Sequence, residues 1–344
     1  MMQHGLRPHR PFYRRGRFWW PVGIVLGLIV SVVLMFTLTP WPNALIIRDI
    51  FQNNAMKVKK VMDDYAPTGV TRVANVNYIF GDKNAYLDVY YPDGTTSPLN
   101  TIVWTHGGAW VSGNKDNDEG YFKTLASHGY TVVALDYGYG PEVKYPVAVQ
   151  EITQALAFIQ ENSAEYNVNP DALVLAGDSA GAQLTSQVAT IITNPDYAAE
   201  MDISPTVSPA QIKGLLLYCG VYDLPALAGG KGALAWGFNN ALWAYTGNKN
   251  VSSSPEVLEM STLNHVTAQF PATYISGGNG DPLTSTQSEP MAKKLGELGV
   301  PLTTLFWPAS TTPALPHEYQ FWLNTDAAQT ALEDSLTFLN QRFG

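Results

Sequence analysis

The chain has 344 residues, of which 46% are hydrophobic and only 14% are charged, and its formal net charge at pH 7 is −9. Because soluble domains usually carry about 25% charged residues, this composition indicates an apolar segment beside one large folded domain. The negative net charge gives no electrostatic support for nucleic-acid binding. No zinc-site spacing and no phosphate-binding glycine loop occurs, so we expect neither a metal nor a cofactor. The single cysteine, Cys219, excludes a disulfide within the chain and is expected to be buried.

The N-terminal region has the pattern of a membrane anchor. Residues 1–17 form a predicted basic cytoplasmic tail, and residues 18–41 form a predicted transmembrane anchor. Residues 22–38 are almost wholly apolar, and Phe18, Trp19 and Trp20 before them suit a membrane interface. This run matches the ~20 residues that span a bilayer and exceeds the ~7–15 of a signal peptide. A cleaved signal peptide is the alternative, but residues 39–44 offer no convincing cleavage site.

The distribution of basic residues predicts the orientation of this anchor. After the apolar run the first basic residue is Arg48, and Lys57, Lys59 and Lys60 come later. Before the run stand five arginines and no acidic residue: Arg7, Arg10, Arg14, Arg15 and Arg17. Positively charged flanks stay in the cytoplasm, so we expect a single-pass protein of the cell membrane whose remaining chain is extracytoplasmic.

Residues 42–74 form a predicted juxtamembrane segment. Their apolar residues recur at helical spacing, as in Ile46, Ile47, Ile50 and Phe51. The pattern leaves open whether this helix is a plain stalk or part of a cap over a binding site.

From residue 75 the chain alternates between strands and helices. Residues 75–80 and 86–91 predict a hairpin around Gly81-Asp82. Further strands are expected at 102–105, 132–135, 172–176, 212–218, 272–276 and 302–307, with helices at 121–127 and 147–160. This alternation predicts an α/β fold with a mainly parallel sheet and helices on both faces. Residues 221–269 interrupt it and contain an aromatic helix at 234–245, which either covers the sheet or belongs to a cap insertion.

A strand, a sharp turn and a helix surround Ser179. The strand at 172–176 runs directly into Gly177-Asp178-Ser179-Ala180-Gly181, and an apolar helical pattern follows. In this order Gly-x-Ser-x-Gly forms a nucleophile elbow, which strains the serine and exposes its Oγ above the sheet. The alternative is a βα turn that only packs.

Three further loops support the elbow. The strand before residue 106 ends in His106-Gly107-Gly108, which is an oxyanion-loop pattern. Asp281 follows the strand at 272–276, and His317 follows the strand at 302–307 across a loop. The order Ser, Asp, His, each beyond the C-terminal end of a strand, is typical of α/β hydrolases.

Through these motifs the chain resembles the α/β-hydrolase superfamily, and within it the hormone-sensitive-lipase-like esterases and acetylesterases. The resemblance covers roughly residues 75–343, which we expect to be the catalytic domain (75–344). Two positions depart from the pattern: Ala109 replaces the third glycine of the oxyanion loop, and Ser285 replaces a common acidic residue. In this superfamily a helical N-terminal segment and an insertion near 221–269 commonly contribute to a cap.

The resemblance implies a role for each residue of the site. Ser179 is the expected nucleophile, His317 the base, and Asp281 the acid that fixes the imidazole tautomer. The N–H groups of Gly107, Gly108 and Ala180 are expected to hold the oxyanion. His106 and Asp178 are expected to be structural, and Glu318 could replace Asp281 only if the loops were rearranged.

These observations predict a membrane-anchored serine carboxylesterase acting on small or medium esters. Its expected partners are a small-molecule ester and, through the N-terminal helix, the membrane. Two alternatives remain: an amide or formamide hydrolase with the same triad, and a non-catalytic binding protein of the hydrolase fold.

Overall fold

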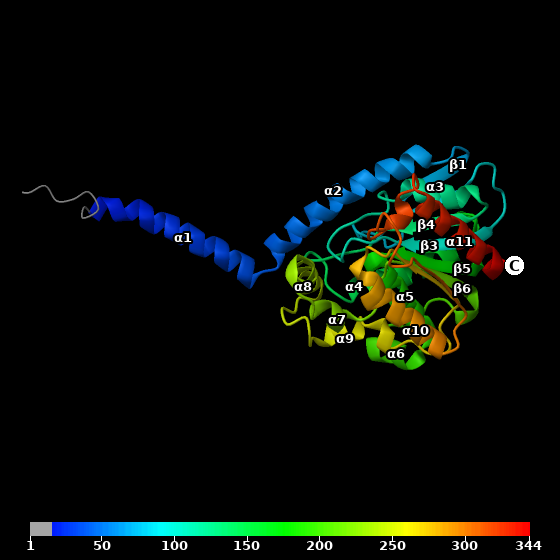
Figure 1. The fold of residues 1–344 in the computed structure, drawn as a ribbon. Coiled ribbons are helices and arrows are strands. Elements are labelled where there is room, and N and C mark those ends of the chain that lie inside the picture. Colours follow the sequence, from blue (N-terminus) through cyan, green and yellow to red (C-terminus); the bar gives the residue numbers. More distant parts are fainter. Residues whose placement is uncertain (1–15) are drawn as a thin grey trace, which may run out of the picture.

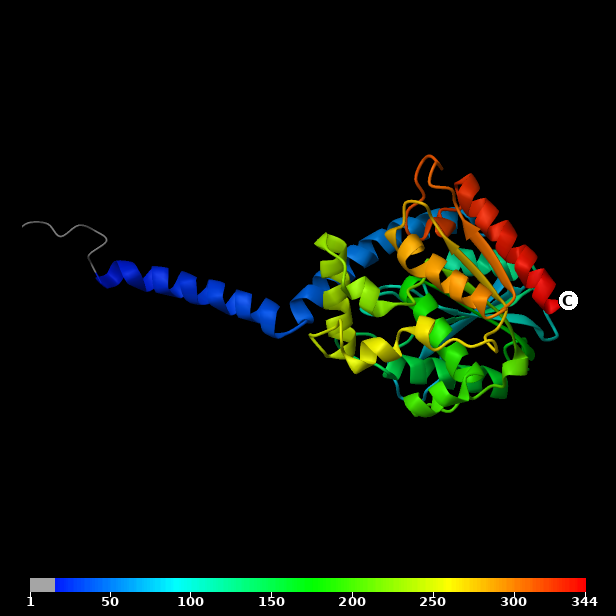
Figure 2. The ribbon, with the colours of Figure 1, turned by 60° about the horizontal axis from the view of Figure 1, so that its bottom comes forward.

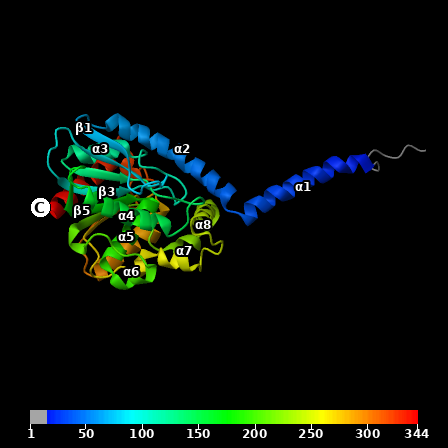
Figure 3. The ribbon, with the colours of Figure 1, turned by 180° about the vertical axis from the view of Figure 1, so that it is seen from behind.

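The computed structural model describes residues 16–344 of the chain (Figure 1). Helix α1 (Gly16–Leu38) projects away from the rest of the structure, as Figures 1 and 3 show from opposite sides. Its segment Trp19–Leu38 is 20 residues long with a mean hydropathy of 2.6, and none of it is buried. By length and composition it could cross a membrane, a property that signal sequences share. The predicted basic tail lies outside the described residues except for its last two positions.

The strands of residues 16–344 form one eight-stranded sheet in the order β1-β2-β4-β3-β5-β6-β7-β8. Strands β1 and β2 pair in antiparallel fashion, as do β2 and β4, and all other pairs are parallel. The strands are β1 (Val70–Asn77), β2 (Tyr86–Pro92), β3 (Leu99–Thr105), β4 (Thr131–Leu135), β5 (Val168–Asp178), β6 (Ile212–Tyr218), β7 (Thr273–Gly277) and β8 (Leu302–Phe306). The predicted fold class is therefore confirmed.

Helices cover both faces of this sheet, because successive side chains of its strands point alternately into two hydrophobic cores. One set of side chains packs with α4 (Val147–Glu161), α5 (Ser179–Thr193) and α10 (Glu289–Glu297): Val103, Val133, Leu175, Leu217 and Ile275. The neighbouring side chains point the other way, toward α3 (Glu119–Ser127) and α11 (Asp326–Phe343): Ile102, Trp104, Val132, Val174, Leu216 and Tyr274. Every residue of α5 is buried, so the elbow helix is held from all sides.

The remaining helices are short or belong to the side near α1. They are α2 (Trp41–Tyr65), α6 (Pro195–Met201), η2 (Pro209–Gln211), α7 (Leu224–Ala228), α8 (Gly232–Thr246), α9 (Pro255–Glu259), η3 (Thr262–Asn264), η4 (Thr284–Ser288) and η5 (Tyr319–Phe321). The aromatic helix predicted at 234–245 is thus present as α8, and the juxtamembrane helix is present as α2.

Helix α2 lies against the domain and does not stand off from it (Figures 1 and 3). It packs on α3 and α8 through the buried side chains of Ala44, Ile47, Val58 and Met62. Arg48 fixes it further, because its guanidinium pairs with Glu142 at 2.7 Å and donates to the carbonyl oxygens of two neighbouring loops.

Strand β1 begins at Val70, five residues before the predicted start, and ends at Asn77. The reason is a shift in register between Val73 and Val76, where Asn75 takes a left-handed conformation with φ 57°. Such a bulge interrupts the alternation of side chains on which the prediction depended.

Candidate active site

Ser179 sits in a strained turn between β5 and α5, with φ at 51°. Two glycines make this turn possible. A Cβ on Gly177 would lie 2.7 Å from the backbone of Gly181, and a Cβ on Gly181 would overlap the carbonyl oxygen of Thr105. The prediction of an exposed serine is wrong, because Ser179 is only 2% exposed. Elements that line the adjacent pocket, α2 among them, close over this edge of the sheet.

The structure brings Ser179, His317 and Asp281 into one hydrogen-bonded chain. The Oγ of Ser179 lies 3.0 Å from Nε2 of His317, and Nδ1 of His317 lies 2.7 Å from a carboxylate oxygen of Asp281. Asp281 also accepts from the backbone N–H of Leu283, which orients its carboxylate. The imidazole is therefore held between a hydroxyl and a buried carboxylate.

Two carboxylates set the proton affinity of His317. Burial disfavours its charged form, but the charges of Asp281 and Glu318 and the hydrogen bond to Asp281 outweigh burial and hold the pKa of His317 well above 6.5. Glu318 lies 3.5 Å from Nε2, on the side of the ring that faces Ser179. Of these two carboxylates, Asp281 contacts Nδ1 and Glu318 does not, so the geometry favours Asp281 over Glu318 as the orienting acid.

The loop after β3 approaches the elbow closely through its glycines. A Cβ on Gly107 would overlap the carboxylate of Asp178, and a Cβ on Gly108, whose φ is 118°, would overlap the carbonyl oxygen of Ser112. The N–H groups of Gly107 and Gly108, two of the three expected to hold the oxyanion, therefore belong to backbone positions that have no room for a side chain.

His106 stabilises this loop through a hydrogen bond and a ring contact. Its Nδ1 donates to the carbonyl oxygen of Gly107 at 2.6 Å, and its ring stacks on Tyr137 with 4.3 Å between the centroids. The Tyr137 hydroxyl donates in turn to the backbone carbonyl of His106 at 2.8 Å. Burial lowers the pKa of His106 to about 4, so this ring stays neutral. These contacts fit the structural role expected for it.

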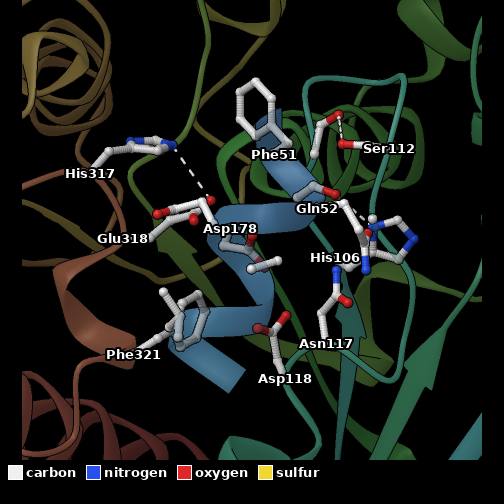
Figure 4. A pocket seen from close by; sticks show the side chains of 16 residues that line it. Phe51, Gln52, His106, Ser112, Asn117, Asp118, Asp178, His317, Glu318 and Phe321 are labelled. Carbon is white, nitrogen blue, oxygen red and sulfur yellow. Dashed lines mark hydrogen bonds and ion pairs between the residues drawn. The ribbon is translucent and has the colours of Figure 1, made fainter. Parts of the chain in front are cut away.

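An acidic pocket lies beside the triad (Figure 4). Figure 4 shows the blue ribbon of α2 crossing between His317 and Glu318 on one side and His106 on the other. The carboxylate of Asp178 accepts from the indole of Trp104 at 2.9 Å. Burial and the charges of Asp118 and Glu318 raise the pKa of Asp178 well above its usual value. Burial also raises the pKa of Asp118 to about 8, so the pocket carries less negative charge at pH 7 than its acids suggest.

Sequence reasoning did not identify Phe51, Gln52 or Asp118 as lining residues of this pocket. The apolar spacing of residues 42–74 predicts the helix that carries Phe51, but not which face of it meets the oxyanion loop. Asp118 precedes α3 without any motif around it. Such residues come together only through packing.

Within residues 16–344, Cys219, Asp281 and His317 bring possible metal-donor atoms within 4.8 Å of one another. Both nitrogens of His317 already contact Asp281 and Ser179. Burial raises the pKa of the Cys219 thiol, which disfavours the thiolate that a metal needs. The arrangement therefore fits proton transfer better than metal binding.

The sheet order, the elbow and the loops define an α/β hydrolase. The sequence model of the BD-FAE family matches residues 87–295, which is more than half of the chain. The protein therefore belongs to the BD-FAE family.

Solved structures share this fold. Esterase B from Lactobacillus Rhamnosis has a TM-score of 0.72 and 23% identity, over 87% of this chain and 95% of that chain. Esterase LipW from Mycobacterium marinum has a TM-score of 0.67 and 22% identity, over 87% and 90%. An esterase from Rhizomucor miehei has a TM-score of 0.67 and 23% identity, over 87% and 91%. The expected resemblance to esterases of the α/β-hydrolase fold is confirmed, and at this identity the likeness establishes the fold.

Proposed function

We propose that this protein is a membrane-anchored serine carboxylesterase that hydrolyses small or medium carboxylic esters through an acyl-enzyme. The observation that carries the proposal is the hydrogen-bonded chain from Ser179 through His317 to Asp281. The esterases among its structural neighbours support the same reaction class.

In the first half of the reaction, Ser179 Oγ attacks the ester carbonyl carbon and its proton passes to Nε2 of His317. Asp281 keeps the other ring proton on Nδ1 and stabilises the imidazolium. The carbonyl oxygen becomes an oxyanion, for which the N–H groups of Gly107, Gly108 and Ala180 are the proposed donors. His317 then returns its proton to the leaving alcohol, which leaves an acyl group on Ser179.

In the second half, water takes the place of the alcohol. His317 removes a proton from this water as its oxygen attacks the acyl carbon, and the same oxyanion donors act again. The carboxylic acid departs when His317 returns the proton to Ser179 Oγ. No atom beyond those of ester and water is needed.

The proposed anchor is α1, with the catalytic domain outside the cytoplasm. Its length and mean hydropathy support a span, and the arginines before it support this orientation. Mature protein that begins after residue 42 would instead mean a cleaved signal peptide.

Ser179→Ala tests the chemistry. In the purified full-length protein we expect this variant to remain folded and to lose several orders of magnitude in kcat on nitrophenyl butyrate. Ser252→Ala, at an exposed serine in a loop, is the matched control and should keep wild-type turnover. If Ser179→Ala keeps more than about a tenth of the wild-type kcat, Ser179 is not the nucleophile.

A further inference from the structure

An apolar groove runs between α2 and α8 and ends beside the oxyanion loop. Phe51 and Ala109 stand at its inner end, and α8 supplies most of one wall. The lining is aliphatic and aromatic: Ile47, Ile50, Phe51, Ala109, Ala233, Leu234, Trp236, Gly237 and Phe238. Among the residues that line it, none is charged. This composition fits an aliphatic chain.

The groove adjoins the catalytic pocket. Phe51 lines both of them, and Ala109 directly follows Gly108 of the oxyanion loop. Because Ser179 is nearly inaccessible to solvent, a substrate must approach it through an opening beside the loop after β3, and both the pocket and the groove reach that loop. A chain lying in the groove would have its ester end next to the proposed oxyanion donors.

Large apolar side chains are exposed on the end of the domain that carries the groove, and we call them the rim. They are Leu45, Ile46 and Ile50 on α2 and Leu234 and Trp236 on α8, and they are 44% to 58% exposed. Farther along α2, from Asn53 onward, Met56 and Tyr65 are also exposed, but the other exposed side chains are polar or charged: Asn53, Asn54, Lys57, Lys60, Asp63 and Asp64. The apolar exposure is thus concentrated in the part of α2 that follows α1. A contiguous apolar patch of this kind marks an interaction surface.

This rim is continuous with the helix that could span a membrane. Only Thr39 and Pro40 separate α1 from α2, and Lys249, beyond the end of α8, donates to the carbonyl of Thr37 at 2.5 Å. The side-chain amide of Asn43 also donates to the carbonyl oxygen of Phe36 and to the side-chain oxygen of Asn240 on α8. In Figure 2 the yellow-green helix α8 stands at the end of the domain nearest to α1 and runs across its direction. A bilayer crossed by α1 would therefore lie against α8 and the start of α2.

We propose that this rim rests in the outer leaflet and that the groove draws the aliphatic chain of an ester dissolved in the bilayer toward Ser179. The inference rests on the proposed esterase function and adds its substrate class, which is membrane-resident lipophilic esters. The exposed apolar side chains then lie in lipid, where their burial is favourable.

Full-length protein in phosphatidylcholine vesicles provides the test. One substrate is a long-chain fluorogenic ester dissolved in the bilayer, and the other is nitrophenyl acetate in water. We expect the double variant Leu45→Gln/Ile46→Gln to lower the ratio of bilayer-ester to soluble-ester turnover by about tenfold. The matched control is Met56→Gln, because Met56 is equally exposed on the same face of α2, ~16 Å farther from α1. This control should leave both turnovers unchanged.

The outcomes separate the two proposals. If the wild type hydrolyses neither ester, the esterase function and this inference both fail. If it hydrolyses only the soluble ester, or if the double variant lowers both turnovers equally, the membrane-fed groove is wrong while the esterase function stands.

A second measurement locates the rim directly. A fluorophore on Leu45→Cys should be quenched by lipids that carry a nitroxide on the acyl chain, whereas one on Met56→Cys should not. Wild-type protein, whose Cys219 is buried, gives the labelling background. Quenching at neither site would overturn the proposal. Fluorescence of the Leu45→Cys label that changes with the amount of protein per vesicle, and not with the nitroxide lipid, would also overturn it, because a second copy of this chain would then cover the rim.

Discussion

The edge of the sheet that carries Ser179 and the side of the domain that faces α1 are stabilised in different ways. At the sheet edge, backbone approaches backbone so closely that Gly177, Gly181 and Gly108 admit no side chain. On the side toward α1, helices α2 and α8 meet through apolar side chains and leave an open groove. In the first region this close packing restricts where the side chain of Ser179 and the backbone of the neighbouring loop can lie. The second region is shaped by apolar side chains alone, so we expect changes there to alter substrate preference more than the chemical step.

The largest effect should come from the acid that orients His317. Asp281→Asn keeps the packing volume but favours the wrong imidazole tautomer, and we expect a loss of up to about 10⁴ in kcat. Glu318→Gln should cost about tenfold or less, because Glu318 does not contact Nδ1. Steady-state kinetics of both variants on one activated ester, with folding checked by circular dichroism, measures the difference. A larger loss in Glu318→Gln would refute the assignment of Asp281.

The next effect should come from the oxyanion loop. Gly108→Ala adds a Cβ that overlaps the carbonyl of Ser112, at a φ of 118° that alanine rarely adopts. Displacing one N–H donor in this way should cost about 10²–10³ in kcat. Gly296→Ala is the matched control, because its Cβ would meet nothing within 4 Å on helix α10. Loss of unfolding stability in place of kcat would mean that Gly108 serves packing alone.

A smaller effect should appear in chain-length preference. Gly237 lines the groove, and a Cβ there would meet nothing within 4 Å. Gly237→Phe should therefore occupy the groove and lower the ratio of octanoate to acetate turnover by about tenfold. Nitrophenyl esters of graded length measure this ratio. An unchanged ratio would show that the groove does not receive the acyl chain.

The pH dependence of turnover should report the charges around His317. As a base, His317 must be neutral, and its pKa is raised well above 6.5, so kcat/KM should rise as pH increases through that raised pKa. Glu318→Gln removes one of the charges that raise it, and the rising limb should move to lower pH. If the rising limb does not move, the charge of Glu318 does not raise the pKa of His317.

The smallest effect should come from the attachment of α2. Arg48→Met keeps the aliphatic stem but removes the pairing with Glu142 and the donors to Val111 and Gly140. These groups are partly exposed, so we expect the free energy of unfolding to fall by only about 1 kcal/mol. Glu142→Gln, which keeps an acceptor for Arg48, should cost less. Thermal unfolding of the full-length proteins compares the two.

The sequence predicts the region around Ser179, which is built from local motifs, far better than the side of the domain that faces α1. The turn at Ser179, the glycine loop after β3 and the strand at Ile212–Tyr218 follow from local patterns, because each depends on a few neighbouring residues. The start of β1 does not, since the bulge at Asn75 breaks its alternation. The burial of Ser179, the position of Phe51 and the pocket side chain of Asp118 depend on α2 folding back over the domain. No local pattern encodes that contact.

The most direct test of the central claim is to locate the group that a fluorophosphonate modifies. Full-length protein is treated until activity is lost and is then digested and sequenced by mass spectrometry. We expect one adduct for each inactivated molecule, on Ser179, and none in Ser179→Ala. Inactive protein with the adduct on another residue, or a fully modified Ser179 with activity intact, would contradict it.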